Sequence, residues 1–205
     1  MQRFVILGAL AILRVQYSGQ ILVGKMDMNY SGNIFLVGPM GVGKTTVGRA
    51  LAEYLGIDFY DSDQEIEVST GADIPWIFDV EGESGFRSRE IRMIDQLSKK
   101  KNIVLATGGG VVLSRENRQR LKKRGVVVYL CASIKQQVMR TSRDKNRPLL
   151  QTSSLEKRIR ELMEIRDPLY REVADIVVDT KRSNPKSVSR DIGERLSEVA
   201  TKLPD

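Results

Sequence analysis

The sequence predicts an α/β protein in which a parallel sheet of five strands lies between two layers of helices. Five short apolar runs recur along the chain, at residues 34–37, 57–60, 103–106, 126–130 and 176–178. Stretches with helical spacing of apolar residues separate them, and such alternation is typical of parallel sheets covered on both faces. No repeat and no second domain interrupts this order, so we expect one three-layer α/β/α unit.

The composition is that of an ordinary globular protein, and two residue counts limit its chemistry. Of 205 residues, 29% are charged and 41% are hydrophobic, with a net charge of +7 that fits a nucleic-acid binder or an enzyme with anionic ligands. A single cysteine, Cys131, allows no intramolecular disulfide and indicates a reducing compartment; we expect its thiol to be buried. The absence of histidine excludes a histidine base and a histidine-ligated metal.

Residues 1–32 differ from the rest, and we expect an extension outside a domain formed by residues 33–205. The ten apolar residues 4–13 are too few to span a bilayer. They are similar to the hydrophobic core of a signal peptide, but no Ala-x-Ala cleavage site follows them. Met26 and Met28 are alternative starts. A targeting segment and an added structural element are the two other interpretations.

The first strand runs into a glycine-rich loop with the pattern that binds phosphate groups. Gly38, four residues and then Gly43, Lys44 and Thr45 match this pattern. Gly38, Gly41 and Gly43 let the backbone N–H groups point inward. Lys44 brings a positive charge to the β- and γ-phosphates, and Thr45 offers a hydroxyl to Mg²⁺. The helix at residues 46–55 directs its positive end at the same anion, so the stretch predicts nucleoside triphosphate binding rather than a structural turn.

Two carboxylates follow the second strand, at Asp61 and Asp63. Residues spaced by two at a strand end point to the same side, toward the crevice where α/β folds bind ligands. The alternative is that Asp61 or Ser62 only caps the helix predicted at residues 64–69. The phosphate-binding loop favours the first interpretation, because Mg²⁺ needs a carboxylate nearby.

The third strand is followed by Thr107 and three consecutive glycines, at residues 108–110. Such a run indicates backbone that approaches a ligand closely, although a loose turn is the alternative. The next helix, residues 114–124, carries six basic residues and one acid. We interpret it as a solvated face, because the aromatic residues that would stack on nucleic-acid bases are missing from it.

Further helices are predicted at residues 72–80, 84–97, 133–141, 155–164 and 185–202. Pro168 is expected to stop the helix of residues 155–164 near Arg166. Arg87 and Glu90 are three residues apart, so they can meet on a helix surface. The polar, basic segment at about residues 142–154 has the composition of a mobile lid. Asp79 to Gly82 matches the Asp-x-x-Gly of GTPases, but no Asn-Lys-x-Asp follows, which argues against a guanine-nucleotide switch.

These motifs together resemble the shikimate kinase family, a small member of the nucleoside-monophosphate-kinase group of P-loop proteins. The matching pieces, in family order, are GPMGVGKTT, FYDSD, GESGFRSRE, ATGGG, RPLL and RDPLY, and they span about residues 33–197. The resemblance implies a P-loop NTPase fold of the NMP-kinase type, with a substrate-binding region after the second strand and a lid over the nucleotide. It implies ATP-dependent phosphorylation of the 3-hydroxyl of shikimate.

The resemblance also implies an ATP site. The loop residues in contact with ATP would be Gly41, Val42, Gly43, Lys44, Thr45 and Thr46, with Mg²⁺ held by Thr45 and Asp61. Arg140 would lie against the adenine, and Arg147 would reach the γ-phosphate from the lid. The family often has an arginine two residues before the proline at position 185; here that residue is Ser183, so Arg182 is the candidate for the second adenine contact.

For the acceptor, the resemblance implies that Asp63 binds the ring hydroxyls and orients the 3-hydroxyl. Arg87 and Arg166 would clamp the carboxylate, Gly109 and Gly110 would supply backbone contacts, and Glu90 would hold Arg87. The catalytic set would be Lys44, Asp63 and Arg147.

Two rival functions stay open on the sequence. One is another small-molecule kinase of the same group, such as a gluconate or nucleoside-monophosphate kinase. The other is a basic nucleic-acid-binding ATPase. The favoured interpretation expects ATP and shikimate as ligands, Mg²⁺ as cofactor, no nucleic acid and no membrane, and a cytoplasmic monomer.

Overall fold

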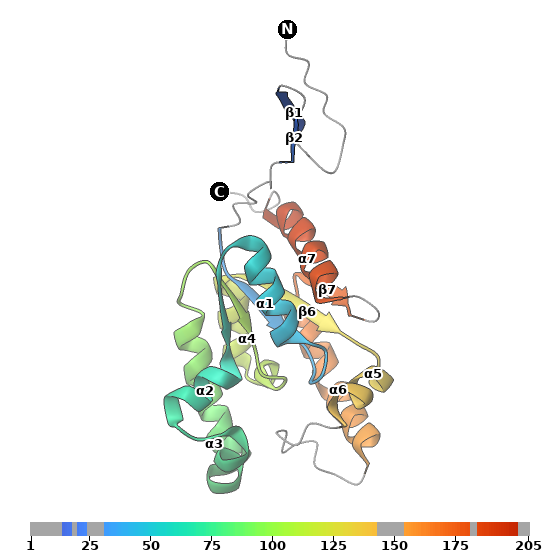
Figure 1. Cartoon of the computed structure of the whole chain (residues 1–205). Helices are drawn as coiled ribbons and strands as arrows, with labels where there is room; N and C mark the ends of the chain where they lie inside the picture. Colours follow the sequence, from blue (N-terminus) through green and yellow to red (C-terminus); the bar gives the residue numbers. More distant parts are fainter. Residues whose placement is uncertain (1–13, 18–19, 24–30, 143–153, 181–183, 201–205) are drawn as a thin grey trace.

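A parallel sheet of five strands forms the centre of the molecule (Figure 1). The computed structural model describes residues 14–17, 20–23, 31–142, 154–180 and 184–200. The strands of the sheet are β3 (Ile34–Val37), β4 (Asp58–Asp61), β5 (Ile103–Ala106), β6 (Val126–Cys131) and β7 (Ile176–Asp179). Their order is β4-β5-β3-β6-β7, and each neighbouring pair is parallel. The predicted fold class is therefore confirmed.

Helices cover both faces of this sheet. They are α1 (Lys44–Leu55), α2 (Ser62–Thr70), α3 (Ile74–Leu97), α4 (Arg115–Arg124), α5 (Ile134–Thr141), α6 (Leu155–Val173) and α7 (Pro185–Ala200), with a short 3₁₀ helix, η1 (Val111–Leu113). α1 and α7 bury their apolar sides against one face, and α3, α4 and α6 bury theirs against the other. The two helical layers place the carboxyl ends of the strands at one open edge, where ligands bind in such folds.

The central strand β3 shows why its sequence is apolar throughout. Ile34 and Leu36 enter the core beneath α1 and α7, whereas Phe35 and Val37 enter the opposite core. Successive side chains point to opposite faces, so a strand covered on both sides needs apolar residues at every position. The expectation that all five strands are apolar throughout is wrong at the edges. β4 reads Asp-Phe-Tyr-Asp, and β7 alternates buried with exposed residues, because an edge strand is only partly covered.

α6 is longer than predicted. The expected stop near Arg166 is wrong, because α6 continues through Pro168 to Val173. Proline removes one backbone donor and crowds the carbonyl four residues earlier. Tertiary packing outweighs that cost, because Tyr170 and Val173 in the added turns are buried in the core. The two helices predicted at residues 72–80 and 84–97 form one run, α3, broken at Gly82 where φ is 70°.

Outside the main sheet, β1 (Arg14–Tyr17) and β2 (Gln20–Val23) pair with each other antiparallel. They belong to the stretch that we expect to lie outside the domain. No helix in the described part of the chain has the length and apolar character needed to cross a membrane. The expected burial of Cys131 holds only in part: its thiol is half-buried, donates to the carbonyl of Val178, and has a pKa raised by that burial.

Candidate active site

A cavity of about 500 Å³ opens at the carboxyl ends of β3, β4 and β5. It brings together most of the site residues that the sequence predicts within the described ranges. The lining includes Gly41, Gly43, Lys44, Thr45, Thr46, Asp61, Asp63, Arg87, Gly109, Gly110, Arg140 and Arg166. Val42 lies in the same loop with its side chain buried in the core beneath α1. Groups from the phosphate-binding loop, the end of β4, the glycines after β5 and five helices (α1, α2, α3, α5 and α6) therefore face one space.

The glycine-rich loop needs its glycines for two different reasons. Gly43 precedes α1 with φ at 93°, a backbone conformation that residues with a Cβ rarely adopt. Gly38 passes so close to β6 that a Cβ would lie 2.3 Å from the carbonyl oxygen of Leu130. Lys44 folds back over the loop, and its Nζ donates to the carbonyls of Gly38 and Pro39 at 2.8 Å each. The lysine charge is thus held at the start of α1, where a phosphate group would be bound.

Asp61 connects the phosphate-binding loop with the end of β4. The hydroxyl of Thr45 donates to Oδ2 of Asp61 at 2.7 Å, and Oδ1 accepts from the backbone N–H of Asp63 at 3.1 Å. Asp61 therefore caps α2 and also lines the cavity beside the phosphate-binding loop, so the cap does not exclude the predicted metal role. A hydroxyl beside one carboxylate is a donor set that suits Mg²⁺, which keeps several waters and binds substrate phosphates as well.

Asp63 does not lie on an extended strand, as the sequence spacing suggested. β4 ends at Asp61, and Asp63 sits in the first turn of α2, which still turns its carboxyl group into the cavity. The pKa of Asp63 is raised to about 7, first by burial and then by the nearby carboxylates of Glu90 and Asp61, against the opposite effect of Lys44 and Arg87. The carboxyl group therefore lies within electrostatic reach of both predicted ligand sites.

Gly108 passes close to the carboxyl groups of both Asp63 and Glu90. A Cβ on Gly108 would lie 2.7 Å from Oδ1 of Asp63 and 2.6 Å from Oε1 of Glu90. The hydroxyl of Ser62 accepts from the N–H of Gly108 at 3.0 Å and donates to Asp63 at 3.4 Å. Ser62 and Gly108 were not among the predicted site residues, although the run of three glycines indicated close approach of the backbone at this loop.

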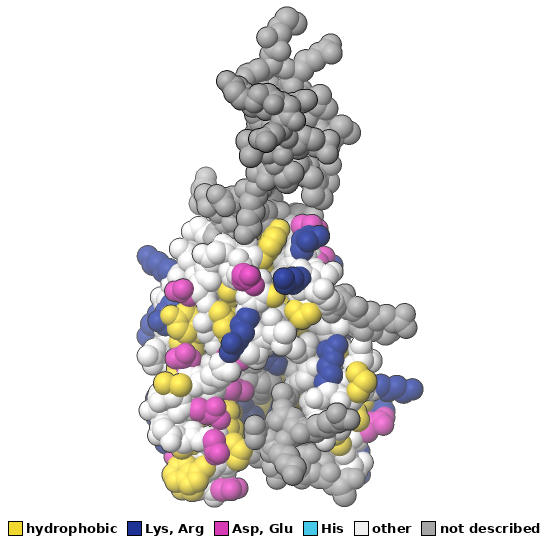
Figure 2. Space-filling model, in the orientation of Figure 1, with side chains coloured by type: hydrophobic (Ala, Val, Ile, Leu, Met, Phe, Trp, Pro, Cys, Tyr) yellow, Lys and Arg dark blue, Asp and Glu magenta, His cyan; other side chains and the backbone are white. Residues whose placement is uncertain are grey.

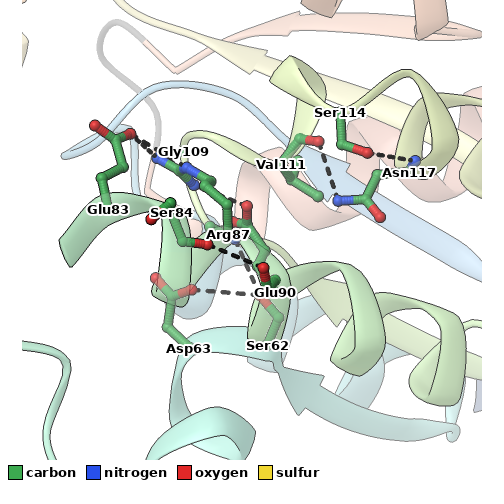
Figure 3. Close-up of polar contacts among 12 residues, drawn as sticks. Ser62, Asp63, Glu83, Ser84, Arg87, Glu90, Gly109, Val111, Ser114 and Asn117 are labelled. Carbon is green, nitrogen blue, oxygen red and sulfur yellow. Dashed lines mark hydrogen bonds and ion pairs between the residues drawn. The ribbon is translucent and has the colours of Figure 1, made fainter. Parts of the chain in front are cut away.

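Arg87 is held between two acids. It donates to Glu90 at 2.7 Å and to Glu83 at 3.0 Å (Figure 3). The expected pair of Arg87 and Glu90 exists, but it does not lie on the surface, because the Glu90 side chain is only 1% exposed. Burial raises the pKa of Glu90, and Arg87 partly offsets that effect. The spacing of Arg87 and Glu90 along one helix predicted their contact. It could not predict that the loop at residues 108–110 covers Glu90.

Arg166 projects from α6 into the same cavity and is only 4% exposed. Its Nη1 donates to the carbonyl of Gly109 at 3.3 Å, and no carboxylate of the described residues lies within ion-pair distance. Burial lowers the pKa of Arg166, because the charged form loses hydration. A buried guanidinium of this kind is stabilised by an anion that enters from solution.

Arg140 lies on the outer side of the phosphate-binding loop. Its Nη1 donates to the carbonyls of Gly41 at 3.3 Å and Val42 at 3.4 Å, and its Nη2 donates to that of Thr180 at 3.3 Å. Arg147, Arg182 and Ser183, and with them the expected lid, lie outside the described residues.

The basic helix α4 places most of its charge in contacts within the molecule. Arg118 pairs with Glu172, Arg120 pairs with Glu116, and both Arg120 and Arg124 pair with Asp95. The face that Figure 2 shows exposes both basic and acidic side chains. These pairs favour a solvated helix face over a surface for the nucleic-acid backbone.

Comparisons with known proteins agree with this arrangement. Residues 40–197 match the family model described as shikimate kinase. A shikimate kinase of Pseudomonas fluorescens (strain Pf0-1) is 58% identical over 167 residues, which are 82% of this chain and 97% of that protein. The solved shikimate kinase from Acinetobacter baumannii, in complex with shikimate, is 50% identical with a TM-score of 0.82, and the match covers 88% of this chain and 100% of that one. The enzyme from Aquifex aeolicus is 37% identical with a TM-score of 0.73, over 82% of this chain and 98% of that one.

Proposed function

The chain belongs to the shikimate kinase family, and on that premise we propose that it transfers the γ-phosphoryl group of ATP to the 3-hydroxyl of shikimate. One observation carries the proposal. A single cavity has a phosphate-binding loop on one side and two largely buried arginines on the other, with Asp63 within electrostatic reach of both. The reaction needs this combination, because it must hold a polyphosphate and an acceptor anion side by side.

The loop would bind the phosphates of ATP. The N–H groups of the loop and the start of α1 favour bound phosphate, and Lys44 would move from its present carbonyl partners to the β- and γ-phosphates. Thr45 and Asp61 would hold Mg²⁺, which neutralises developing phosphate charge when bound. Arg140 would lie against the adenine, Arg182 would supply the second adenine contact and Arg147 would reach the γ-phosphate; the roles of Arg147 and Arg182 rest on the family resemblance alone.

The far end of the cavity would bind the acceptor. Arg87 and Arg166 would hold the carboxylate of shikimate, and the backbone at Gly109 and Gly110 would complete the contact. Planar guanidinium groups suit a carboxylate because they donate two parallel hydrogen bonds. Glu90 keeps Arg87 oriented toward the cavity through the 2.7 Å contact. Gluconate also carries a carboxylate, so the two arginines would select only for acceptors with a carboxylate. The shape of the cavity would have to distinguish shikimate from the others.

Asp63 would orient the 3-hydroxyl toward the γ-phosphorus. In the transfer the hydroxyl oxygen forms a bond to that phosphorus, the bond to the bridging oxygen of ADP breaks, and the hydroxyl proton passes to Asp63 or to solvent. A loose transition state draws little charge from the nucleophile, so orientation by Asp63 contributes more than early proton removal.

We further infer that the enzyme acts as a monomer in the cytoplasm. The described residues of a single chain supply groups for both proposed ligands. A reaction that consumes ATP requires a compartment that supplies it, and a single cysteine agrees with a reducing one.

A panel of acceptors tests the proposed function. ADP formation with Mg²⁺ and ATP is measured for shikimate, gluconate and nucleoside monophosphates at equal concentrations. We expect shikimate to be phosphorylated with a kcat/KM at least about 100-fold above the others, since a mismatched polar acceptor leaves buried groups unpaired. Faster phosphorylation of gluconate or a nucleotide would refute the assignment. Stimulation of ATP hydrolysis by single-stranded nucleic acid would favour the rival class instead.

A further inference from the structure

Two tyrosines are stacked inside the core next to the acceptor end of the cavity. Tyr170 of α6 and Tyr129 of β6 are fully buried, and their ring centroids lie 5.0 Å apart at an angle of 25°. Both rings contribute to the packing of the core, because stacked aromatic pairs stabilise a core beyond the area they bury. Their hydroxyl groups differ in what they contact.

The hydroxyl of Tyr129 donates to Oδ1 of Asp167 at 2.6 Å, away from the cavity lining, and Arg171 binds the other oxygen of that carboxylate at 2.7 Å. The hydroxyl of Tyr170 instead donates to the carbonyl of Gly109. Burial raises the pKa of Tyr170, and the neighbouring Arg166 only partly offsets this effect, so the hydroxyl stays protonated and remains a donor.

The carbonyl of Gly109 therefore accepts two hydrogen bonds from one helix. Tyr170 and Nη1 of Arg166 both reach it from α6. A peptide group is planar and trans, so fixing a carbonyl on one side fixes the N–H of the next residue on the other side. Two donors from α6 thus turn the N–H of Gly110 away from that helix.

Gly110 lines the cavity beside Arg87. A Cβ on Gly110 would lie 2.3 Å from both Nη1 and Nη2 of Arg87, so the backbone passes directly next to the guanidinium. The following amides have partners, since Val111 donates to Gly108 and Leu113 donates to Gly110. Within the described ranges the N–H of Gly110 has no acceptor. A donor without a partner beside an arginine suits an anionic oxygen.

We propose that Tyr170 is a positioning residue for the acceptor: through the carbonyl of Gly109 it directs the N–H of Gly110 at the carboxylate that Arg87 binds. The proposal rests on the proposed function and deepens it. It also explains why α6 carries a tyrosine at a fully buried position where phenylalanine would pack equally well. Arg166 alone would have to hold Gly109 if the hydroxyl were absent, while it also binds the substrate.

The test compares Tyr170→Phe with Tyr129→Phe. Each substitution removes one buried hydroxyl and keeps the stacked ring. The carbonyl of Gly109 keeps Arg166 as a donor, and the carboxylate of Asp167 keeps Arg171 on its other oxygen. We expect Tyr170→Phe to raise the KM and Kd for shikimate by about 5- to 30-fold, with a change in KM for ATP below about twofold. Tyr129→Phe should leave both constants unchanged, and the two variants should show similar Tm values.

Three results would overturn the positioning role. They are a normal shikimate KM in Tyr170→Phe, equal effects of this substitution on shikimate and ATP, and failure of Tyr170→Phe to fold while Tyr129→Phe folds. A wild-type enzyme inactive on shikimate is a separate outcome that would refute the proposed function. An active wild type whose Tyr170→Phe variant binds shikimate normally would refute only the role of Tyr170.

Discussion

The carboxyl group of Asp63 shows how single residues in this cavity balance opposing charges. It lies beside two acids and two cations, and burial adds to the effect of the acids. Its pKa is therefore raised from 3.8 to about 7 although Lys44 and Arg87 lie within reach. Binding of Mg²⁺ and ATP would bring further charges close to Asp63, so the raised pKa applies to the enzyme without ligands.

Asp63 makes the stability of the free enzyme depend on pH. Between pH 3.8 and about 7 the folded state binds more protons at Asp63 than the unfolded state, so the stability contributed by its protonation is lost as pH rises through about 7. The Tm of the wild type relative to Asp63→Asn should therefore fall between about pH 4 and pH 7. Thermal unfolding without ligands or metal measures this, and a constant difference between the two proteins across that range would contradict the pKa shift.

Arg87 should matter for one ligand only. Arg87→Ala removes half of the proposed carboxylate clamp and should weaken shikimate binding by about 2–5 kcal/mol, with little change in ATP affinity. Arg87→Lys keeps the charge beside Glu90 but not the planar fork, so it should also lose at least about tenfold in shikimate affinity. Calorimetric titration with each ligand measures both effects.

Arg89→Ala is the matched control, because Arg89 lies on the same helix, pairs with Glu81 and does not line the cavity. It should bind both ligands normally. Equal losses for ATP and shikimate in Arg87→Ala would mean that Arg87 serves the fold rather than the acceptor site.

At the scale of elements, the active site depends on how chain segments end. β3 ends in the phosphate-binding loop, β4 ends at Asp61, and β5 ends in the glycines of residues 108–110. Because parallel strands end at the same edge, these three termini meet, and the helices that follow them start there. Asp61 serves two elements at once, since it caps α2 and accepts from Thr45 at the start of α1.

The two roles of Asp61 can be separated by substitution. Asparagine caps helices about as well as aspartate, so the free energy of unfolding of Asp61→Asn should lie within about 1 kcal/mol of the wild-type value. The lost carboxylate charge should raise the Mg²⁺ concentration needed for half-maximal activity, and added Mg²⁺ should restore part of the rate. Asp61→Ala should lose both the cap of α2 and the proposed carboxylate ligand of Mg²⁺. Asp61→Asn with an unchanged Mg²⁺ requirement would exclude Asp61 from the metal site.

Elements that are determined by a few neighbouring residues could be predicted from the sequence, and elements that depend on distant contacts could not. The strands and the phosphate-binding loop could be predicted, because runs of apolar residues and the spacing of glycines are visible within a few residues of the sequence. The continuation of α6 through Pro168 could not, because it depends on packing of Tyr170 and Val173 against distant strands. The burial of Glu90 was missed for the same reason: the loop that covers it follows β5, and helix spacing carries no information about that loop.

At the scale of the whole molecule, we propose that the domain carrying both ligand sites begins near Asn33. The family match covers residues 40–197, and the Pseudomonas fluorescens relative is matched over nearly its full length by only 82% of this chain. We propose that residues 1–32 are an extension that the domain does not need. Its position before the first strand of the main sheet supports this view.

Removal of the first 25 residues should therefore leave the enzyme intact. A chain that starts at Met26 should show the same kcat, the same KM for both substrates and a Tm within a few degrees of the full chain. Steady-state kinetics and thermal unfolding of the two chains provide the comparison. A large loss of activity or stability would mean that the extension is a structural element of the domain.

The central claim is that one cavity joins ATP to the 3-hydroxyl of shikimate, and identification of the product tests it most directly. Shikimate, ATP and Mg²⁺ are incubated with the enzyme, and phosphorus–proton NMR correlation shows which carbon bears the new phosphate. The account predicts one product, shikimate 3-phosphate, formed in equal amount to ADP. Phosphate on another hydroxyl, or ADP formed without any phosphorylated shikimate, would contradict it.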